Sequence, residues 1–175
     1  MVEKVQERGE EPEPEELIWT YNRRYRDEYV RQRLTGAVVV KGRELTHEQG
    51  RMGFNKYYCH VKYWAGQGVP YWLIFVNRIR KHSGKHVHQG GLGLFILEGK
   101  GWTVVDGVRY DWEKDDLVLL PVKPGGCEHQ HFSADPDKPS EWLAFIFNPY
   151  FEAMGWPLDQ KEDNPDWKGP PSVPH

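Results

Sequence analysis

A succession of short apolar runs, separated by turn-forming residues, constrains the fold of this chain most strongly. The runs YWLIFVNRI (71–79) and WLAFIFN (142–148) are rich in aromatic and β-branched residues, which favour strands. Asp106-Gly107 lies between the alternating runs GWTVV and VRYDWE, and this arrangement strongly predicts a β-hairpin. Because no helical pattern intervenes in this part of the chain, the sequence predicts an all-β antiparallel sandwich or barrel.

The N-terminal part has a different composition. Residues 1–14 are acidic and contain prolines, with too little apolar content to fold alone, so we expect them to be disordered. After Pro14, apolar residues recur at every fourth position and predict an amphipathic helix over 15–34. This stripe consists of Leu17, Tyr21, Tyr25 and Tyr29. Arginines line the other faces, which suits either a basic patch for an acidic partner or a solvated helix face.

The C-terminal part is predicted to end the domain. The run NPYFEAMGW at 148–156 is typical of a short helical turn, and the polar, Pro-rich residues 157–175 predict an extended tail. We therefore expect one domain over 15–156, with its barrel at about 37–148. A chain of this length can bury a hydrophobic core of its own.

Charge and composition argue against several classes of protein. The chain has 175 residues and a formal net charge of −3, which favours neither nucleic acid nor an anionic membrane as a partner. We see no apolar run of membrane-spanning length and no secretory signal at the N-terminus. Two cysteines, Cys59 and Cys127, form no disulfide framework, which favours a reducing cytoplasm, although a disulfide between the two stays open.

Two His-x-His pairs are the strongest chemical signal in the sequence. His86 and His88 are two residues apart, so both side chains point to the same face of a strand. His129 and His131 repeat this arrangement about forty residues later. Neutral imidazole is the commonest side-chain ligand of divalent transition metals, and three such ligands leave coordination positions open for catalysis. The pattern therefore indicates a metal site.

The order of these pieces resembles the cupin superfamily, whose two motifs lie on strands of a small jelly-roll barrel. The family's first motif, G-x5-H-x-H-x3,4-E-x6-G, is matched by HSGKHVHQGGLGLFILEGKG, which contains His86 and His88. Its second motif, G-x5-P-x-G-x2-H-x3-N, is matched by DDLVLLPVKPGGCEHQHFS, in which Pro124 and Gly126 precede His129. The resemblance covers about residues 70–148. It implies a cupin jelly-roll barrel, and a metal site formed by His86, His88 and His129.

The chain departs from the family pattern at one metal ligand. The glutamate of the first motif should fall near Leu92 or Gly93, where there is no carboxylate, and Glu98 is expected to face solvent in the following turn. Ser133 replaces the final Asn of the second motif. The ligand set implied is thus three histidines without a glutamate, which resembles the gentisate- and salicylate-dioxygenase-like cupins.

This resemblance implies an Fe(II) dioxygenase that cleaves a small hydroxylated aromatic or enol-type substrate with O₂. Two alternatives stay open. One is a metal-dependent cupin of another reaction class, such as an isomerase or lyase using Zn, Mn, Ni or Cu, and the other is a cupin that binds a small ligand without catalysis. The expected partners are a small-molecule substrate and O₂, with no nucleic acid and no membrane. We also expect a homo-oligomer, most simply a dimer, because the tyrosine stripe of the N-terminal helix needs a surface to cover it. Packing of this helix on its own barrel is the alternative.

Further residues are candidates for the site. His131 shares a strand face with His129 and is a candidate catalytic acid or base, a fourth ligand, a second-sphere partner or a residue lining the pocket mouth. Arg78, Arg80 and Asn77 precede the first motif and are candidates to bind a carboxylate-bearing substrate. For the two arginines, a solvated strand end is the alternative. Cys127 can contact the metal or be an inert part of the barrel wall.

Overall fold

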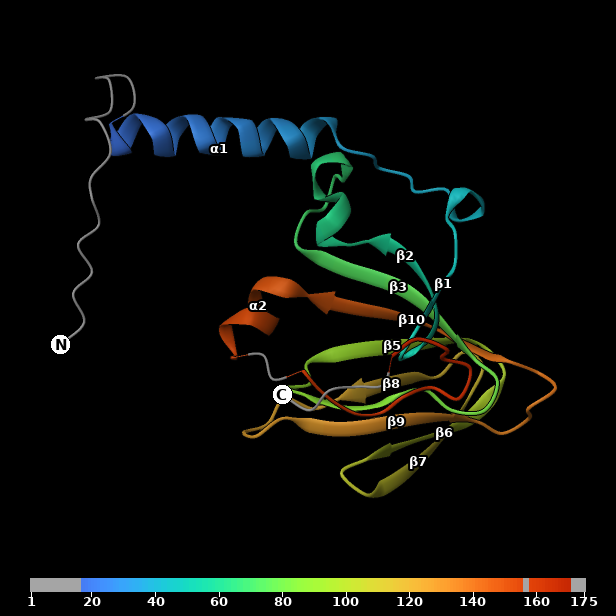
Figure 1. The fold of residues 1–175 in the computed structure, drawn as a ribbon. Helices are drawn as coiled ribbons and strands as arrows, with labels where there is room; N and C mark the ends of the chain where they lie inside the picture. Colours follow the sequence, from blue (N-terminus) through green and yellow to red (C-terminus); the bar gives the residue numbers. More distant parts are fainter. Residues whose placement is uncertain (1–16, 156–157, 171–175) are drawn as a thin grey trace.

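Two antiparallel sheets form the body of the protein (Figure 1). The computed structural model describes residues 17–155 and 158–170, apart from the side chains of 63–65. The expected disordered segment, residues 1–14, lies outside these described residues. The all-β jelly-roll prediction is confirmed, although the described strands do not join edge to edge into one closed barrel.

Eleven strands are distributed over the two sheets of the described chain. In spatial order, the six-stranded sheet consists of β1 (Glu48–Gly50), β2 (Gly53–Cys59), β3 (Trp72–Ile79), β10 (Ser140–Phe147), β5 (Leu92–Glu98) and β8 (Leu117–Leu120). The five-stranded sheet consists of β11 (Asp159–Glu162), β4 (Lys85–His88), β9 (Cys127–Ser133), β6 (Lys100–Val105) and β7 (Val108–Glu113). The helical segments are α1 (Ile18–Thr35), η2 (Gly42–Glu44), η3 (Val61–Gly66) and α2 (Asn148–Ala153).

The core lies between the two sheets and follows from strand alternation. Along β10, the side chains of Trp142, Ala144 and Ile146 are buried, whereas those between them point to the outer face. Ile96 of β5 and Ile79 of β3 are almost completely buried in the same cluster. The long apolar runs seen in the sequence therefore supply one face to the core and leave a second apolar face outside.

The hairpin predicted at Asp106-Gly107 joins β6 and β7. Val105 pairs with Val108, and both turn residues have positive φ angles, 49° for Asp106 and 83° for Gly107. This is the backbone that a two-residue type I′ turn requires, and Asp-Gly adopts it readily. The turn sets the register of β6, which in turn pairs with β9 of the histidine sheet.

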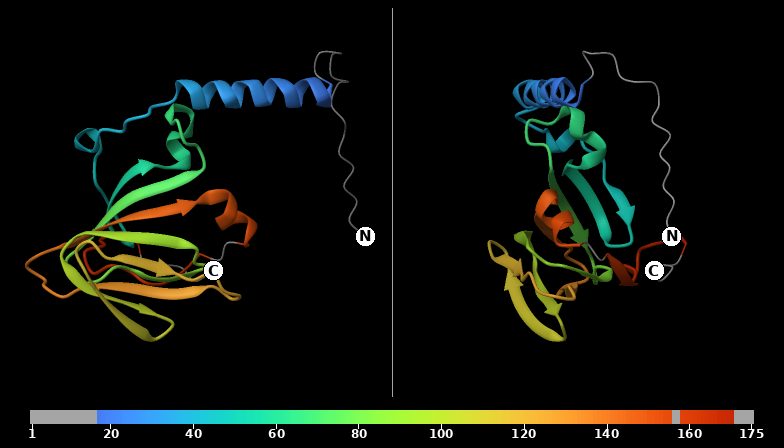
Figure 2. Two further views of the ribbon diagram at one scale, coloured as in Figure 1. Left: turned by 180° about the vertical axis from the view of Figure 1, so that it is seen from behind. Right: turned by 90° about the vertical axis from the view of Figure 1, so that its left-hand side faces the viewer.

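Helix α1 projects away from the sheets and contacts the rest of the protein near its C-terminal end (Figures 1 and 2). None of its residues is buried, so the predicted amphipathic stripe does not cover the protein's own core. Tyr29 alone of the tyrosines in the stripe meets a barrel ring, that of Tyr71, with ring centroids 5.4 Å apart. Among the described helices, none is long and apolar enough to cross a membrane.

The C-terminal segment is more ordered than its Pro-rich sequence suggests. Instead of only an extended tail, residues 158–170 contain β11, which pairs antiparallel with β4 so that Gln160 lies opposite His86. Asn164 is 4% exposed and ties this segment to two loops. Its side-chain Nδ2 donates to the carbonyl of His82 at 3.0 Å, and its backbone N–H donates to the carbonyl of Arg51 at 2.7 Å. The C-terminal segment therefore belongs to the histidine sheet.

We predict that Asn164→Ala destabilises the protein by about 1–3 kcal/mol, because the carbonyl of His82 loses its amide donor in a buried setting. Chemical denaturation of the variant and the wild type measures the change. The matched control is Thr46→Ala at an exposed position before β1, for which the change should stay within about 0.5 kcal/mol. Equal stability of Asn164→Ala and the wild type would show that the C-terminal segment does not support the histidine sheet.

Candidate metal centre

The pairing of β4 with β9 brings three histidines together. His86 lies directly opposite His129, and His88 lies opposite Cys127. The ring centroid of His129 is 4.2 Å from that of His86 and 4.5 Å from that of His88. One ring nitrogen from each of the three lies within 4.8 Å of the others, and all three residues are buried. The three histidines that the cupin resemblance implied as ligands can therefore hold one metal ion.

A tight turn after His88 positions the first histidine pair. Gly90 and Gly91 have φ angles of 81° and 72°, in the left-handed region that glycine adopts without strain. A Cβ atom at Gly90 would lie 1.9 Å from the carbonyl oxygen of Pro121, so no other residue fits there. The turn takes the chain from β4 in one sheet to β5 in the other, with the cavity between them.

Burial keeps the three imidazoles neutral, which is the form that binds metal. Loss of solvation lowers the pKa of His88 to about 3 and that of His129 to about 4. Burial also lowers the pKa of His86 well below its usual value, and the neighbouring histidines lower it further. At neutral pH, a lone pair is therefore available on each ring.

Hydrogen bonds at Nδ1 differ among the three rings. Nδ1 of His129 lies 3.0 Å from the carbonyl of Cys127 and donates to it, which leaves Nε2 as the free ligand atom. Nδ1 of His88 instead accepts the backbone N–H of Gly90 at 3.0 Å, so the proton of the neutral ring sits on Nε2. For His88 to bind a metal through Nε2 as a neutral ligand, this proton would move to Nδ1 and the hydrogen bond from Gly90 would be lost. Nδ1 of His86 is buried without a well-formed hydrogen bond, although the Gly84 backbone favours its protonated form. The donor set fits a divalent transition metal.

His131 lines the same cavity as the three histidines but is not grouped with them as a ligand. Its Nδ1 atom lies 2.7 Å from Oγ1 of Thr103, which also accepts the indole N–H of Trp112 at 2.9 Å. Thr103 is completely buried, so this contact orients the ring firmly. Burial lowers the pKa of His131 well below its usual value, and His131 is therefore a neutral hydrogen-bonding group in the cavity wall.

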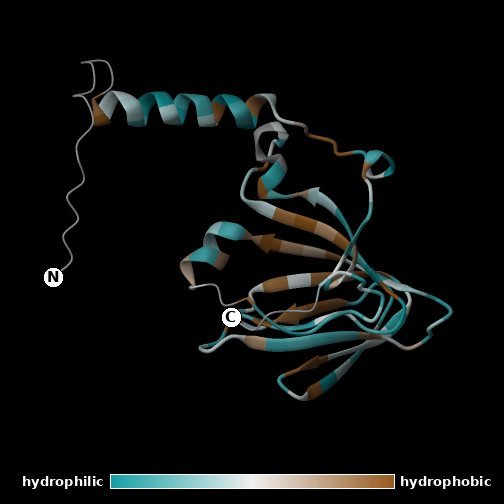
Figure 3. Ribbon diagram, viewed as in Figure 1, coloured by the Kyte–Doolittle hydropathy of each residue, from teal (hydrophilic) through white to brown (hydrophobic). Residues whose placement is uncertain are grey.

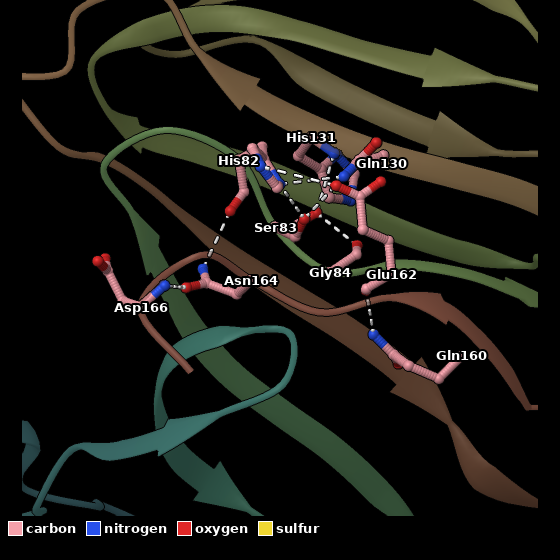
Figure 4. A network of polar contacts seen from close by, with 9 residues as sticks. All are labelled: His82, Ser83, Gly84, Gln130, His131, Gln160, Glu162, Asn164 and Asp166. Atoms are coloured by element: carbon pink, nitrogen blue, oxygen red, sulfur yellow. Dashed lines mark hydrogen bonds and ion pairs between the residues drawn. The ribbon is translucent and has the colours of Figure 1, made fainter. Parts of the chain in front are cut away.

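A network of polar contacts holds the start of β4 against β9 (Figure 4). Ser83 donates its backbone N–H to the carbonyl of His131, and its Oγ accepts the backbone N–H of His131. The side chain of Gln130 donates to the carbonyl of Ser83 at 3.1 Å. Glu162 of β11 lies 3.8 Å from His82, which is part of this network and outside the cavity. Ser83 thereby aligns the two histidine strands.

The cavity beside the histidines has a volume of about 210 Å³ and is lined mainly by apolar and aromatic side chains. Its polar lining, apart from His86, His88, His129 and His131, comes from Asn55, Asn77, Tyr57 and His60. Within the described part of the chain, no aspartate, glutamate, lysine or arginine lines it. Leu92 occupies the wall near the place where the family's glutamate was expected, and Glu98 is exposed and paired with Lys114.

Of the residues predicted to bind substrate, the structure brings only Asn77 to the cavity. Arg78 follows it on β3, points to the outer face and forms an ion pair with Glu141. Arg80 is also exposed and lies beyond the last residue of β3. The reason is strand alternation, because neighbouring residues face opposite sides of a sheet. A cationic clamp built from the two arginines is therefore not part of this cavity.

Other cavity residues lacked a motif that could have identified them. Asn55 on β2 accepts the side-chain amide of Asn77 at 2.8 Å, a pairing between strands that only the fold reveals. Leu158 reaches the cavity from the C-terminal segment, which the sequence had placed outside the domain. Cys127 is fully buried, and burial raises the pKa of its thiol to about 11, so it stays protonated at neutral pH.

We predict that the metal-free protein loses stability in mild acid. The pKa of a buried histidine is lowered relative to the unfolded chain, so the unfolded state binds the proton more readily as the pH falls below about 6.5. When the pH falls from 7 to 5, the free energy of unfolding should decrease by roughly 2 kcal/mol for each of His88 and His129. Chemical denaturation at both pH values, with His129→Gln as the control that removes one histidine's share, measures this. A pH-independent stability would contradict the burial of neutral imidazoles.

Comparisons with known proteins agree with this architecture. The sequence matches no protein-family model and no curated protein sequence. Among solved structures, a cupin-like protein from Thermotoga maritima aligns with a TM-score of 0.51 and 18% identity over 74% of this chain and 92% of its own.

Two further structures have named activities. Salicylate 1,2-dioxygenase from Pseudoaminobacter salicylatoxidans aligns with a TM-score of 0.50 and 20% identity, over 84% of this chain and 39% of its own. A predicted oxalate decarboxylase from Thermotoga maritima aligns with a TM-score of 0.50 and 20% identity, over 63% of this chain and 99% of its own. At such identities these likenesses concern the fold alone, and the chain has a cupin fold.

Proposed function

We propose that this protein is an Fe(II)-dependent dioxygenase that cleaves a small, oxygen-chelating substrate with O₂. His86, His88 and His129 would hold the ion, which when bound supplies the site at which O₂ is activated. The observation that carries the proposal is the buried group of three neutral histidines, with no carboxylate beside it among the described residues. The fold likeness to a salicylate dioxygenase supports the same reaction class by analogy.

The charge balance of the cavity indicates the substrate class. Three neutral ligands leave a divalent ion with its full charge, and the described cavity wall contains no acidic side chain to offset it. A bound substrate therefore stabilises the site by bringing a negative charge on oxygens that face His86, His88 and His129. A second negative charge elsewhere on the substrate would lie in an apolar cavity without a cationic partner, which is costly. We infer a compact monoanion, such as an enolate or a phenolate with a neighbouring carbonyl.

The remaining polar groups of the cavity would orient this substrate. Nδ2 of Asn77 donates to Asn55, whereas Oδ1 of Asn77 is buried with no hydrogen-bond partner among the described residues. Asn77 is thus available to accept a hydroxyl hydrogen bond. His131, oriented by Thr103, offers a neutral ring for a second contact. Phe151 packs on His88 with ring centroids 5.2 Å apart and helps to keep water from the histidines.

The alternative is a metal-dependent reaction without O₂, catalysed with Zn, Mn or Ni. The fold likeness to a predicted oxalate decarboxylase supports this alternative, because the same cupin scaffold serves more than one chemistry.

The two buried, unpaired cysteines, Cys59 and Cys127, fit the reducing cytoplasm in which we propose that the protein acts.

The experiment starts from metal-free protein loaded anaerobically with Fe(II), Mn(II), Ni(II) or Zn(II). An oxygen electrode then measures O₂ uptake with a panel of hydroxylated aromatic acids, neutral hydroxyketones and 1,3-diketones. We expect uptake only with Fe(II), and a preference for substrates that carry one negative charge when chelated. Substrate turnover with Zn(II) and without O₂ would overturn the dioxygenase assignment in favour of the alternative. Absence of any turnover with Fe(II) across the panel would also count against it.

We predict that His86→Ala and His129→Ala each weaken metal affinity by at least about 100-fold, because each removes one of three ligands. Isothermal titration calorimetry with Zn(II) or anaerobic Fe(II) measures the loss. His47→Ala is the matched control, since His47 stacks on Phe54 outside the cavity, and it should bind metal as the wild type does. Full metal retention in both cavity variants would place the metal site elsewhere.

A further inference from the structure

Helix α1 presents a surface that the described part of the protein does not cover. Its 18 residues include none that is buried, and Ile18, Tyr21 and Tyr25 are 81%, 51% and 53% exposed on one stripe. The rings of Tyr21, Tyr25 and Tyr29 form a continuous ladder, with successive centroids 6.4 and 6.2 Å apart. In proteins, most of the stability of a helix comes from packing of its apolar face, so an exposed helix of this kind calls for a partner surface.

The base of α1 is fixed to the barrel, which sets the direction of the helix. The backbone N–H of Ala37 donates to the carbonyl of Gly66 at 2.9 Å, and Gly68 donates to the carbonyl of Ala37. At Gly36, an added Cβ would lie 2.4 Å from the backbone of Gln67, so the chain passes closely there. From this base the helix runs above the sheets in Figure 1, separated from them along most of its length (Figures 1 and 2). Beyond the contact of Tyr29 with Tyr71, the exposed rings of Tyr21 and Tyr25 are therefore accessible to a second molecule.

The composition of α1 is that of a protein interface. Its sequence, IWTYNRRYRDEYVRQRLT, contains three tyrosines, one tryptophan and five arginines, and it contains no lysine, alanine or serine. Tyrosine, tryptophan and arginine are enriched in interfaces and their hot spots, whereas lysine, alanine and serine are depleted. A helix that only faces solvent is not expected to be rich in tyrosine and arginine while lacking lysine, alanine and serine.

A second uncovered apolar surface lies on the outer face of the six-stranded sheet. Phe145 and Phe147 of β10 are 38% and 42% exposed, and Leu117 and Leu119 of β8 are 56% and 68% exposed. Strand pairing places Leu117 opposite Phe95, which is also exposed. Figure 3 shows the apolar colouring along β3 and β10. One face of an antiparallel sheet is normally polar when it meets solvent, so this outer face is typical of an interface.

We propose that α1 of each copy packs on the outer face of the six-stranded sheet of a second copy of this chain, in a two-fold symmetric dimer that exchanges helices. Each copy supplies one helix and one sheet face, and within one copy the described contacts of α1 are mainly with η3 and with Tyr71, which precedes β3. The exchange covers both apolar surfaces at once. It is independent of the metal centre and of the reaction assigned to it.

Charge and area both favour a second copy as the occupant. Five arginines on α1 outnumber Asp27 and Glu28, while Asp115 and Asp116 lie beside the outer sheet face just before β8. Glu98 at the end of β5 is already paired with Lys114. An 18-residue helix is about 27 Å long and about 10 Å wide, so each helix-on-sheet contact covers roughly 270 Å² of each surface. Two such contacts bury roughly 1,100 Å² in total, which reaches the about 1,000 Å² that a specific interface needs.

The test is the molecular mass of the full chain in solution, measured by size-exclusion chromatography with light scattering at micromolar concentrations. We expect a dimer for the wild type. Tyr25→Glu on the helix and Leu119→Glu on the sheet should each raise the dissociation constant by at least about 100-fold, because each places a charge in both contacts. Val108→Glu is the matched control, since Val108 is 53% exposed at the tip of the other sheet, and it should stay dimeric. Circular dichroism verifies that each variant is folded.

Mixing the two variants tests whether the dimer forms by exchange of helices. A heterodimer of Tyr25→Glu with Leu119→Glu retains one intact contact, between the native helix of one chain and the native sheet of the other. Native mass spectrometry should therefore detect the heterodimer at concentrations where neither variant pairs with itself.

Several results would overturn the proposal. A monomeric wild type would overturn it. This holds also if α1 of the monomer binds an acidic polymer such as RNA. A dimer that survives Tyr25→Glu but not Leu119→Glu would indicate packing of sheet on sheet without the helix. Failure of the mixed variants to pair would exclude the exchange even if each variant alone is monomeric.

Discussion

The register between β4 and β9 is the constraint on which the rest of this structure depends. Because His86 lies directly opposite His129, both side chains point to the same side of the sheet, and His88 and His131 follow on that side two residues along each strand. A shift of one residue in either strand would turn its histidines to the outer face. The contacts of Ser83 with His131, the pairing of β11 with β4 and the turn at Gly90 all hold this register. Much of the protein's polar network therefore serves to keep four neutral imidazoles in one apolar cavity.

The described cavity wall carries no charged side chain, and this determines which substrates the site favours. Where a carboxylate was expected, Leu92 forms part of the wall, and Arg78 of β3 faces away. The metal would thus be the dominant charge in the site, and a substrate would be recognised by how its oxygens compensate that charge. The size of the cavity, about 210 Å³, restricts this to small molecules. Recognition then depends on shape and on the amide of Asn77 more than on ion pairing.

The sequence alone was sufficient for the features that depend on local periodicity. The Asp106-Gly107 hairpin, the all-β class and the shared face of each His-x-His pair follow from turn chemistry and strand alternation. Alternation also shows that Asn77 and Arg78 cannot both face the cavity. It does not show which of the two does, because both faces of β3 are apolar and the sequence therefore does not identify the buried face. The roles of Asn55, Ser83 and Asn164 depend on contacts across 22 to 82 residues, as in Asn77–Asn55 and Asn164–His82. A helix stripe predicted from Leu17 to Tyr29 exists, but only the fold shows that the chain's own core does not use it.

The most direct test of the account is anomalous X-ray diffraction from crystals grown with Fe(II) under anaerobic conditions. The account predicts one iron peak per chain, about 2.0–2.3 Å from a ring nitrogen of His86, His88 and His129, with no protein carboxylate among the ligands. A peak at another position, a carboxylate ligand, or an empty cavity in iron-loaded crystals would contradict it.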